Sequence, residues 1–313
     1  MPWSAGEAVF RTFSRHFLPN RLDWLCKRTA KRKGRKILLA WNRGLGDIAL
    51  GLYAIVHRIR ALVPHAEISF LVRENLLDGF SLLDGVEAFA ALGWKRGEPY
   101  DVEQSLLAIG RDPKAYDLII PWPSPSDWVR WQHGTLVPRL SWKKEYDDLW
   151  KRFSLDEGVI YIGAQASAET NYGLWRNWPE GRWREFFEGL RRYPKVRTLL
   201  FGYGNTPCYE SDQIIDLRGK TTLFELLSII KNRCSHLIAP DSGVLSMAYY
   251  LDQPFPLQVI SLWADPKHGI LKQNVASPNP LLVHRPLIGS HRDCSSISAE
   301  SVLTTLFGNS HGK

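Results

Sequence analysis

Residues 36–72 have the sequence KILLAWNRGLGDIALGLYAIVHRIRALVPHAEISFLV. Lys36–Trp41 predicts a buried strand because it is a short, almost continuous apolar run. A turn over residues 42–47 follows, and Ile48–Val63 then keeps one apolar face at helical spacing until a proline ends it. Glu67–Val72 predicts the next strand. A strand, a helix and a strand in this order indicate parallel pairing.

The same alternation continues along the chain. Further strands are predicted at Asp117–Pro121, Gly158–Gly163, Val196–Phe201, Ile214–Leu217, His236–Ala239 and Leu257–Trp263. Helices are predicted at Pro179–Arg191 and Thr222–Lys231, and a third runs from the turn after Ala239 to Leu251. The pattern predicts an α/β protein with mostly parallel sheets, in which ligands bind at the carboxyl ends of the strands.

The length of 313 residues exceeds what one core usually accommodates, so two domains are expected. Residues 121–150 interrupt the alternation with Pro, Ser and Trp, and they predict a long loop that connects the domains. We therefore expect a leader over residues 1–35 and two Rossmann-like domains over residues 36–150 and 151–313. Two such domains that face each other would form a central cleft.

The positive charge of the chain is concentrated near its beginning. Residues 1–36 hold ten of the 40 Lys and Arg residues but only Glu7 and Asp23 among the 32 acidic ones. Apolar residues recur there at helical spacing, so the leader is a basic amphipathic segment that fits an anionic membrane surface. A solvated arm, a helix packed on the body and a nucleic-acid contact are the alternatives; nucleic acid is not among the partners that we expect.

Other features indicate a cytoplasmic protein, which the basic leader would place at the inner face of the cytoplasmic membrane. No apolar run approaches the roughly 20 residues that cross a bilayer, and the start lacks the pattern of a signal peptide. The four cysteines are far apart without a CxxC pair, which fits free thiols and argues against a zinc site. The sequence has no Asp-x-Asp element in a strand context, so we expect neither a metal nor a cofactor. The pair Asp147-Asp148 is expected on a solvated helix.

The turn Arg43-Gly44-Leu45-Gly46-Asp47 is the first candidate site. Two glycines between a strand and a helix let the backbone approach a ligand closely. Gly44-x-Gly46-x-x-Ala49 also matches a dinucleotide fingerprint, with Glu74 as the ribose acid of a dehydrogenase. However, Asp47 would place a carboxylate where a pyrophosphate needs backbone N–H groups. A carboxylate there is better suited to accept a proton from a hydroxyl, and helix capping is the alternative role.

Two further candidates belong to the second domain. Asp241-Ser242-Gly243 lies between a predicted strand and a helix, where backbone N–H groups can hold a diphosphate. Arg176 lies just before Pro179, which fits the first turn of a helix. A guanidinium there is suited to a diphosphate leaving group, whose charge grows as a glycosidic bond breaks. Packing of Arg176 on a Trp is the alternative.

Together these segments resemble the family-nine glycosyltransferases, the ADP-heptose:lipopolysaccharide heptosyltransferases. The resemblance covers about residues 36–266. Residues 37–72 are similar to the opening of that family, and RNWPEGRW (176–183) resembles its K-x-W-P-x-x-x-W element. LRGKTTLFEL (217–226) resembles its D-L-x-G-K-T-S-L-x-E-L segment, and APDSGVLSMAYYLDQP (239–254) resembles its D-S-G element. No single motif is decisive, but the four occur in the family's order.

The resemblance implies a GT-B fold with an acceptor domain over 36–150 and a nucleotide-sugar donor domain over 151–313. It implies a metal-independent, inverting transfer of heptose from ADP-heptose to a lipopolysaccharide core or another lipid-linked glycan. Asp47 would be the general base, and Arg176 would contact the diphosphate. The implied substrate-binding residues are Arg43, Gly44, Leu45, Gly46, Thr221 (beside the adenine), Asp241, Ser242, Gly243 and Ser246.

The sequence departs from the family at three places. Ser246 replaces the His that follows the D-S-G element, Arg176 replaces a Lys, and residues 262–266 replace an F-G-P-T segment. Arg and Lys are not equivalent at a tight phosphate site. A transferase for another sugar nucleotide and an inactive sugar-nucleotide binder therefore remain alternatives. Four tryptophans of the connecting stretch are expected either to pack or to stack on acceptor sugars or lipid: Trp122, Trp128, Trp131 and Trp142.

Overall fold

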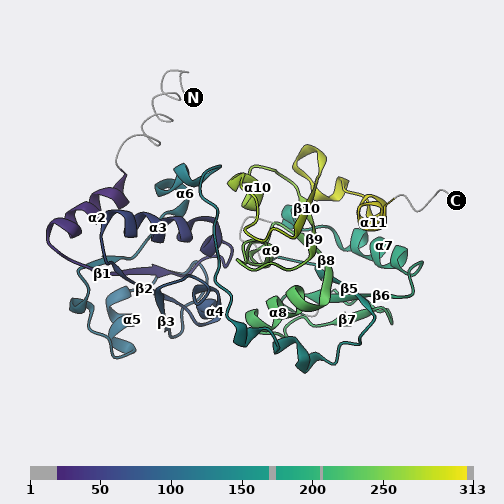
Figure 1. Cartoon of the computed structure of the whole chain (residues 1–313), viewed down its shortest axis with the longest axis horizontal. Helices are drawn as coiled ribbons and strands as arrows, with labels where there is room; N and C mark the ends of the chain where they lie inside the picture. The colour runs from purple at the N-terminus through teal and green to yellow at the C-terminus, as the bar shows by residue number, and fades with distance from the viewer. Residues whose placement is uncertain (1–19, 169–173, 205–206, 309–313) are drawn as a thin grey trace, which may run out of the picture. The chain divides into compact units, whose positions relative to one another are not determined.

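The computed structural model describes residues 20–168, 174–204 and 207–308 (Figure 1). The chain divides into two compact units, Met1–Leu140 and Ser141–Lys313. The division lies ahead of the expected boundary after residue 150, so the end of the connecting stretch belongs to the second unit. Among the residues described, no helix has both the length and the apolar composition that crossing a bilayer requires.

The first unit contains a four-stranded sheet in the order β3-β2-β1-β4, with every neighbouring pair parallel. Its strands are β1 (Lys36–Trp41), β2 (Glu67–Arg73), β3 (Val86–Ala91) and β4 (Leu118–Ile120). The predicted parallel pairing is confirmed, and Leu39 of β1 is in register with Phe70 of β2 and Ile120 of β4. The strand β3 was not predicted from the sequence.

Helices cover both faces of this sheet. Figure 1 shows α2 (Arg21–Lys31) and α3 (Tyr53–Leu62) on one side and α5 (Val102–Ala108) on the other. Two short helices, α4 (Leu77–Phe80) and α6 (Pro125–Trp128), complete the unit. The predicted helix over 48–63 is irregular at its start, because Ile48–Leu52 forms a π-helix, η1, before α3 begins.

The helix α2 lies within the expected leader, of which residues 1–19 are outside the described residues. Asn20 caps it by accepting a hydrogen bond from the Asp23 backbone N–H at 3.1 Å. Leu22 and Cys26 are fully buried, and Asp23 accepts a 2.8 Å hydrogen bond from Arg58 of α3. This part of the leader is therefore a helix packed on the body, with its basic residues on the exposed face.

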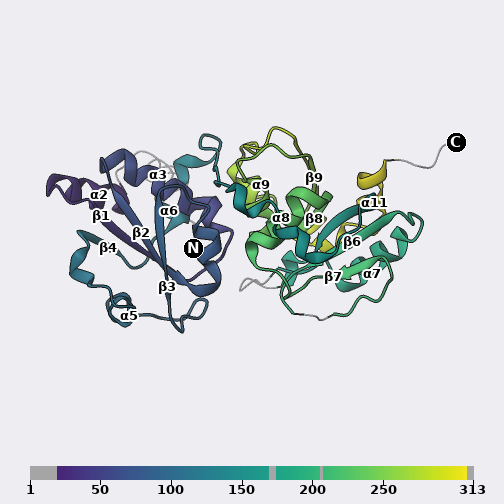
Figure 2. The same ribbon diagram turned by 60° about the horizontal axis from the view of Figure 1, so that its bottom comes forward.

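The second unit contains a six-stranded parallel sheet in the order β10-β9-β8-β5-β6-β7 (Figure 1). Figure 2 shows its strands β6, β7, β8 and β9 from another side. Its strands are β5 (Ile160–Gln165), β6 (Val196–Phe201), β7 (Ile214–Asp216), β8 (Cys234–Pro240), β9 (Leu257–Trp263) and β10 (Leu282–Ile288). Its helices are α7 (Glu180–Leu190), α8 (Leu223–Arg233), α9 (Gly243–Tyr249), α10 (Gly269–Gln273) and α11 (Ala299–Phe307). The predicted strands of this region are confirmed, and β10 is an addition to them.

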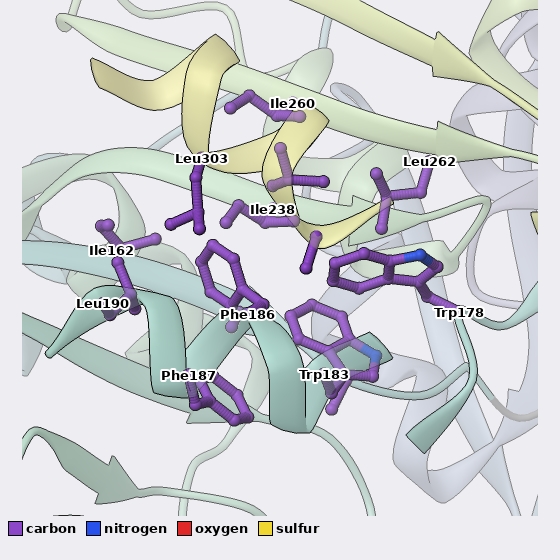
Figure 3. Packing of buried hydrophobic residues seen from close by; sticks show 14 of the residues in the cluster. Ile162, Trp178, Trp183, Phe186, Phe187, Leu190, Ile238, Ile260, Leu262 and Leu303 are labelled. Carbon is purple, nitrogen blue, oxygen red and sulfur yellow. The ribbon is translucent and has the colours of Figure 1, made fainter. Parts of the chain in front are cut away.

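An aromatic core joins α7 and α11 to one face of this sheet (Figure 3). Trp183 and Phe186 of α7 are fully buried. The Trp183 ring lies 4.9 Å from the ring of Trp178, edge to face. The Trp178 indole N–H donates to the backbone oxygen of Ile297 at 2.9 Å, which ties the start of α7 to the segment before α11.

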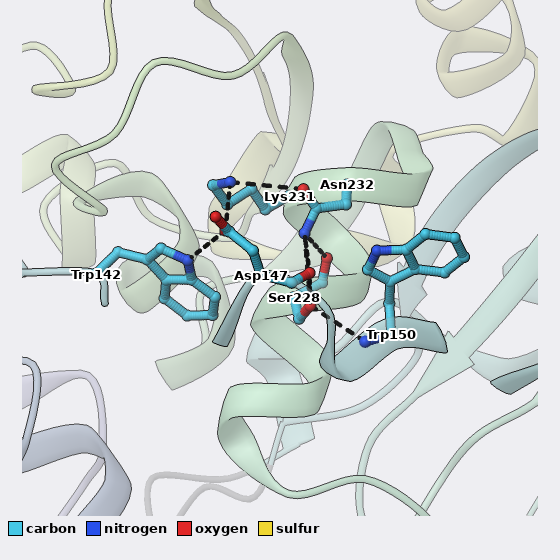
Figure 4. A network of polar contacts seen from close by, with 6 residues as sticks. All are labelled: Trp142, Asp147, Trp150, Ser228, Lys231 and Asn232. Atoms are coloured by element: carbon cyan, nitrogen blue, oxygen red, sulfur yellow. Dashed lines mark hydrogen bonds and ion pairs between the residues drawn. The ribbon is translucent and has the colours of Figure 1, made fainter. Parts of the chain in front are cut away.

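The segment that follows the division between the units is attached to α8 (Figure 4). The Asp147 carboxylate accepts hydrogen bonds from Trp142 at 2.8 Å and from Lys231 at 2.7 Å. Its backbone oxygen accepts from the Ser228 hydroxyl at 2.9 Å and from the Asn232 amide at 3.0 Å. Although burial alone would raise the pKa of Asp147, these side-chain donors hold it below its usual value. Asp147 is thus a structural anchor and not a solvated helix residue.

Candidate functional site

The turn after β1 is fixed by its own side chains and by a neighbouring loop. Asn42 is buried, and its amide donates to the backbone oxygen of Glu98 at 2.8 Å. The Trp41 indole N–H donates to the backbone oxygen of Gly44 at 3.2 Å. The backbone oxygens of Leu45 and Gly46 accept the first hydrogen bonds of the π-helix, from Ile48 and Leu50. These hydrogen bonds hold the backbone of the turn in place, and with it the side chains that the turn carries.

Asp47 precedes the helix without capping it. Its backbone is in the right-handed helical region, and its side chain accepts no hydrogen bond from the first turn. A Cβ atom at Gly44 would lie 2.9 Å from Oδ2 of Asp47, closer than real Cβ contacts allow. The absence of a side chain at Gly44 therefore makes room for the carboxylate. The capping role that the sequence left open does not apply to Asp47.

Three arginines surround this turn. Arg73, at the end of β2, donates to the backbone oxygen of Arg43 at 2.8 Å. A terminal nitrogen of Arg96 lies 3.9 Å from the position that a Cβ at Gly44 would take. The Arg43 guanidinium lies 5.8 Å from the centre of the Trp41 ring. The carboxyl edge of the first sheet therefore combines a carboxylate with several cations.

The four tryptophans named above differ in exposure; the connecting stretch also contains Trp150. Trp128 and Trp142 are buried, and Trp131 is half-buried beside His57, with the ring centres 6.1 Å apart. Trp122 has 52% of its surface exposed. The expectation of packing therefore holds for Trp128 and Trp142, whereas Trp122 presents a ring to the surface.

In the second unit the structure brings two predicted residues together. Arg176, in the short 3-10 turn Leu174–Arg176, forms an ion pair with Asp241, which follows β8. Their side chains are only 18% and 10% exposed. The Arg176 guanidinium lies 5.8 Å from the centre of the Trp175 ring, so it both contacts a Trp and pairs with a carboxylate. A largely desolvated pair of this kind fixes the positions of both groups.

The rest of the Asp241-Ser242-Gly243 turn is occupied by the start of α9. The Ser242 hydroxyl caps the helix by accepting from the Leu245 N–H at 3.1 Å, and Gly243 is the first helical residue. Ser246 is 1% exposed, and its hydroxyl donates back to the Ser242 backbone oxygen at 3.1 Å. In this conformation the Ser246 side chain belongs to the helix and not to an accessible surface.

Thr221 also follows the carboxyl end of a strand of this sheet, but of a different strand from the one that Asp241 follows. It precedes Thr222, whose side chain caps α8 by accepting from the Glu225 N–H at 3.3 Å. The strand before this turn, β7, is separated from β8 by β5 and β6. Thr221 and Asp241 are therefore at different positions along one carboxyl edge.

A polar cluster after β9 was not predicted from the sequence. Asp265 accepts a backbone hydrogen bond from Lys267 and pairs with Arg292, and both interactions hold its pKa below the usual value. His268 lies 3.6 Å from Asp265, and burial together with the charge of Arg176 lowers the pKa of its imidazole. Its ring contacts Trp175 edge to face at 6.0 Å. The sequence signal that could have identified this cluster was an acidic residue shortly after a predicted strand, as at Asp241.

Gly269 connects this cluster to Asp241. Its φ is +48°, and a Cβ there would lie 2.6 Å from the Trp263 ring and would collide with Oδ1 of Asp241. Gly269 therefore brings the segment after β9 directly against Asp241, beside the Arg176–Asp241 pair. Within the described ranges, no group of three or more His, Cys, Asp or Glu residues is arranged to hold a metal ion.

Comparison with known proteins gives a result for the fold alone. The sequence matches no protein-family model and no curated protein. The structure is similar to ADP-heptose LPS heptosyltransferase II of E. coli, with a TM-score of 0.59, 17% identity, and coverage of 87% of this chain and 97% of that one. It is also similar to a glycosyl transferase family 9 protein of Veillonella parvula DSM 2008, with a TM-score of 0.53, 15% identity, and coverage of 86% and 95%.

The chain has the family-nine glycosyltransferase fold. The resemblance inferred from the four motifs is therefore confirmed at the level of the fold. Within this family-nine fold, Asp47 belongs to the first unit, and Arg176, Thr221 and the Asp241–Gly243 turn belong to the second.

Proposed function

We propose that the protein is an inverting glycosyltransferase that moves a sugar from a nucleotide sugar to a glycan acceptor. The observation on which this rests is the position of Asp47. Its carboxylate lies over Gly44 at the carboxyl end of β1 and does not cap the helix that follows. A carboxylate held in this way is suited to accept the proton of an attacking acceptor hydroxyl.

The second unit supplies the groups for the donor. Arg176 lies beside Asp241 at the carboxyl end of β8, in a largely desolvated position. A guanidinium has five N–H donors, so Arg176 can keep its bond to Asp241 while it binds a diphosphate oxygen. Its fixed charge would stabilise the negative charge that the leaving diphosphate gains as the glycosidic bond breaks.

The proposed reaction is a direct displacement. The acceptor oxygen forms a bond to the anomeric carbon as its proton passes to Asp47, and the bond from that carbon to the diphosphate oxygen breaks. Attack opposite the leaving group inverts the anomeric configuration. The donor that we propose first is ADP-heptose and the acceptor a lipopolysaccharide core or another lipid-linked glycan, because the E. coli protein of similar fold is an ADP-heptose LPS heptosyltransferase.

We also propose an anionic membrane surface as a partner, through the leader. In α2 and the residues after it, the exposed side chains are Arg21, Trp24, Lys27, Arg28, Lys31, Arg32, Lys33, Arg35 and Lys36. Basic groups near anionic lipid each contribute about 1 kcal/mol of attraction. The leader would thereby bring the enzyme to a lipid-linked acceptor at the inner face of the cytoplasmic membrane.

A donor screen tests the proposed function. The melting temperature of the protein would be measured with ADP-, GDP- and UDP-sugars and with NAD(H). A ligand at 100 times its dissociation constant adds about 2.7 kcal/mol of stability, and we expect this with ADP or an ADP-sugar. Stabilisation by GDP- or UDP-sugars alone would keep the reaction and discard heptose. A response to NAD(H) alone would contradict the proposal and favour a dehydrogenase.

Asp47→Asn separates catalysis from binding. The amide keeps the size of the side chain but cannot accept the proton, so we expect transfer to fall by at least 100-fold. The shift in melting temperature with the donor should remain, because Asp47 belongs to the other unit from Arg176. As a control, Asp148→Asn changes an exposed carboxylate and should leave transfer unchanged. Full activity of Asp47→Asn would exclude Asp47 as the general base.

A further inference from the structure

Three aromatic rings form a stack at the surface of the first unit. The Trp122 ring lies 4.2 Å from the Tyr100 ring, and the Tyr100 ring lies 4.0 Å from the Trp94 ring. Trp122 is the outer member, with 52% of its surface exposed. An aromatic residue normally buries most of its large surface, so an exposed ring backed by two others calls for an explanation.

Hydrogen bonds hold the stack in place. The Tyr100 hydroxyl donates to the backbone oxygen of Pro121 at 2.6 Å, directly before Trp122. The Trp94 indole N–H donates to the Ser105 hydroxyl at 2.9 Å. Burial raises the pKa of Tyr100 to about 12, so its hydroxyl continues to donate this bond even in alkaline solution. The outer ring is therefore presented on a rigid base, which reduces the entropy lost when a ligand stacks on it.

The stack lies at the carboxyl ends of the strands of the first sheet, where Asp47 is also found. The strands β1 and β4 are parallel neighbours, so the turn after β1 and the residues after β4 leave the sheet at the same edge. Arg43 of that turn is close enough to Tyr100 to influence its pKa electrostatically. After Trp122 the chain enters α6, where Pro125 packs against Gly51 of the π-helix. Trp122 and Asp47 thus belong to adjoining segments.

We propose that Trp122 is the platform on which a sugar ring of the acceptor stacks. This rests on the proposed function, and it adds the residue that recognises the acceptor. The C–H bonds on one face of a pyranose ring are apolar and slightly positive, and they match the negative face of an indole. Stacking there holds the glycan in a fixed orientation at the edge from which Asp47 takes a proton.

A sugar fits this ring better than a lipid does. A tryptophan that enters a membrane extends its ring into the headgroup region, whereas the ring of Trp122 is held against Tyr100. An aromatic ring that is held in place on one side offers its other face to a flat ligand such as a sugar ring. Polar groups of the Arg43–Asp47 turn follow the adjacent strand, and they suit the hydroxyl groups around a sugar ring.

Binding of a core oligosaccharide tests the proposal. The probe is the oligosaccharide released from lipopolysaccharide by complete deacylation, titrated into the full chain by calorimetry. We expect Trp122→Ala to weaken its affinity about tenfold and Trp122→Phe to retain most of it, because Phe keeps an aromatic face. The melting-temperature shift with the donor should be the same in both variants and in the wild type.

Trp24→Ala is the matched control, since Trp24 is 56% exposed on α2 and lies outside the stack. It should leave oligosaccharide affinity unchanged. Equal affinity of wild type and Trp122→Ala, or no binding to the wild type, would overturn the proposal. Loss of binding to phosphatidylglycerol vesicles in Trp122→Ala, with oligosaccharide affinity intact, would assign the ring to lipid instead. Failure of the proposed function is seen separately, as the absence of any donor response.

Discussion

Asp47 differs from the residues that begin other helices of this chain. Asn20, Thr222 and Ser242 each accept a hydrogen bond from a backbone N–H of the first turn. Asp47 already has helical backbone angles, and its side chain makes no capping hydrogen bond. The position of the Asp47 carboxylate is therefore not set by helix capping, which agrees with the general-base role proposed above.

At the residue scale, Gly269→Ala tests the surface around Asp241. The added methyl group would collide with Asp241 and approach Trp263, at a φ of +48° that disfavours alanine. We expect the Arg176–Asp241 pair to be displaced and the affinity for the donor nucleotide to fall about tenfold or more. Titration calorimetry with ADP measures this directly.

Gly181→Ala is the matched control for Gly269→Ala. Gly181 lies in α7 with open space around its Cβ position. Alanine there should raise the free energy of unfolding by about 0.5–1 kcal/mol and leave ADP affinity unchanged. If Gly269→Ala binds ADP like the wild type, the surface after β8 and β9 does not hold the nucleotide.

The sequence predicts single candidate site residues, but it does not predict which of them contact one another. Asp47, Arg176 and Asp241 were each indicated by their place beside a strand or a helix. The ion pair between Arg176 and Asp241 joins residues 65 positions apart, and no local pattern predicts such a contact. The cluster at Asp265 and His268 was missed because its segment departs from the family pattern that indicated the other residues.

At the scale of elements, the two strands that the sequence did not predict lie at sheet edges. The strands β3 and β10 each have only one neighbouring strand. Because an edge strand is less buried, its sequence needs no continuous apolar run. The strand β10 even contains Pro286, which an edge strand tolerates because the lost N–H is not needed for pairing on the open side. The strands with neighbours on both sides were all predicted.

The contact of α7 with α11 gives a prediction at this scale. Gly189 of α7 lacks a Cβ at the place that the Leu303 side chain of α11 occupies. Leu303 is 4% exposed, so Leu303→Ala leaves a cavity between the helices and the sheet. We expect a loss of about 2–5 kcal/mol in the free energy of unfolding, measured by urea titration of tryptophan fluorescence.

Thr304→Ala serves as the control for Leu303→Ala, because Thr304 is the exposed neighbour in the same helix. It should change the free energy of unfolding by no more than about 0.5 kcal/mol. A loss below about 1 kcal/mol for Leu303→Ala would mean that α11 contributes little to the core of the second unit.

At the scale of the whole molecule, the uneven distribution of charge predicts membrane binding. Lys27, Arg28 and Lys31 lie on the exposed face of α2. Replacing all three with Gln removes about 3 kcal/mol of attraction to anionic lipid, so binding should weaken by about 100-fold. Co-sedimentation with phosphatidylglycerol vesicles measures the change, and binding of the wild type should fall as salt is raised.

The control for this triple variant takes its charges from the second unit. Arg191, Arg192 and Lys195 are also exposed, and their replacement by Gln removes the same net charge from another surface. Vesicle binding that falls equally in both variants would indicate general electrostatics and not a leader surface. Wild-type protein that sediments equally well with phosphatidylcholine would contradict an anionic preference.

The two-unit organisation followed from length and from the recurring strands and helices. The position of the division did not, because it depends on contacts made after folding. The segment after Leu140 looks like a polar linker in sequence, yet Asp147 attaches it to Lys231 and Ser228 of α8. Those residues are more than 80 positions away in the chain, and a local pattern contains no information about them.

The π-helix after Asp47 determines how Asp47 is rotated about the helix axis relative to the buried face of α3. Each residue of an α-helix advances the chain by about 100° around the axis, and a π-turn holds one residue more than an α-turn. If Ile48–Leu52 were wound as an α-helix without a change in the number of residues, α3 could keep its buried face while Asp47 rotated by about 100°. The direction of the proposed base therefore depends on this segment being wound as a π-helix. An evolving chain that gained one residue there could therefore keep both the buried face of α3 and the direction of Asp47, because a π-turn holds the additional residue.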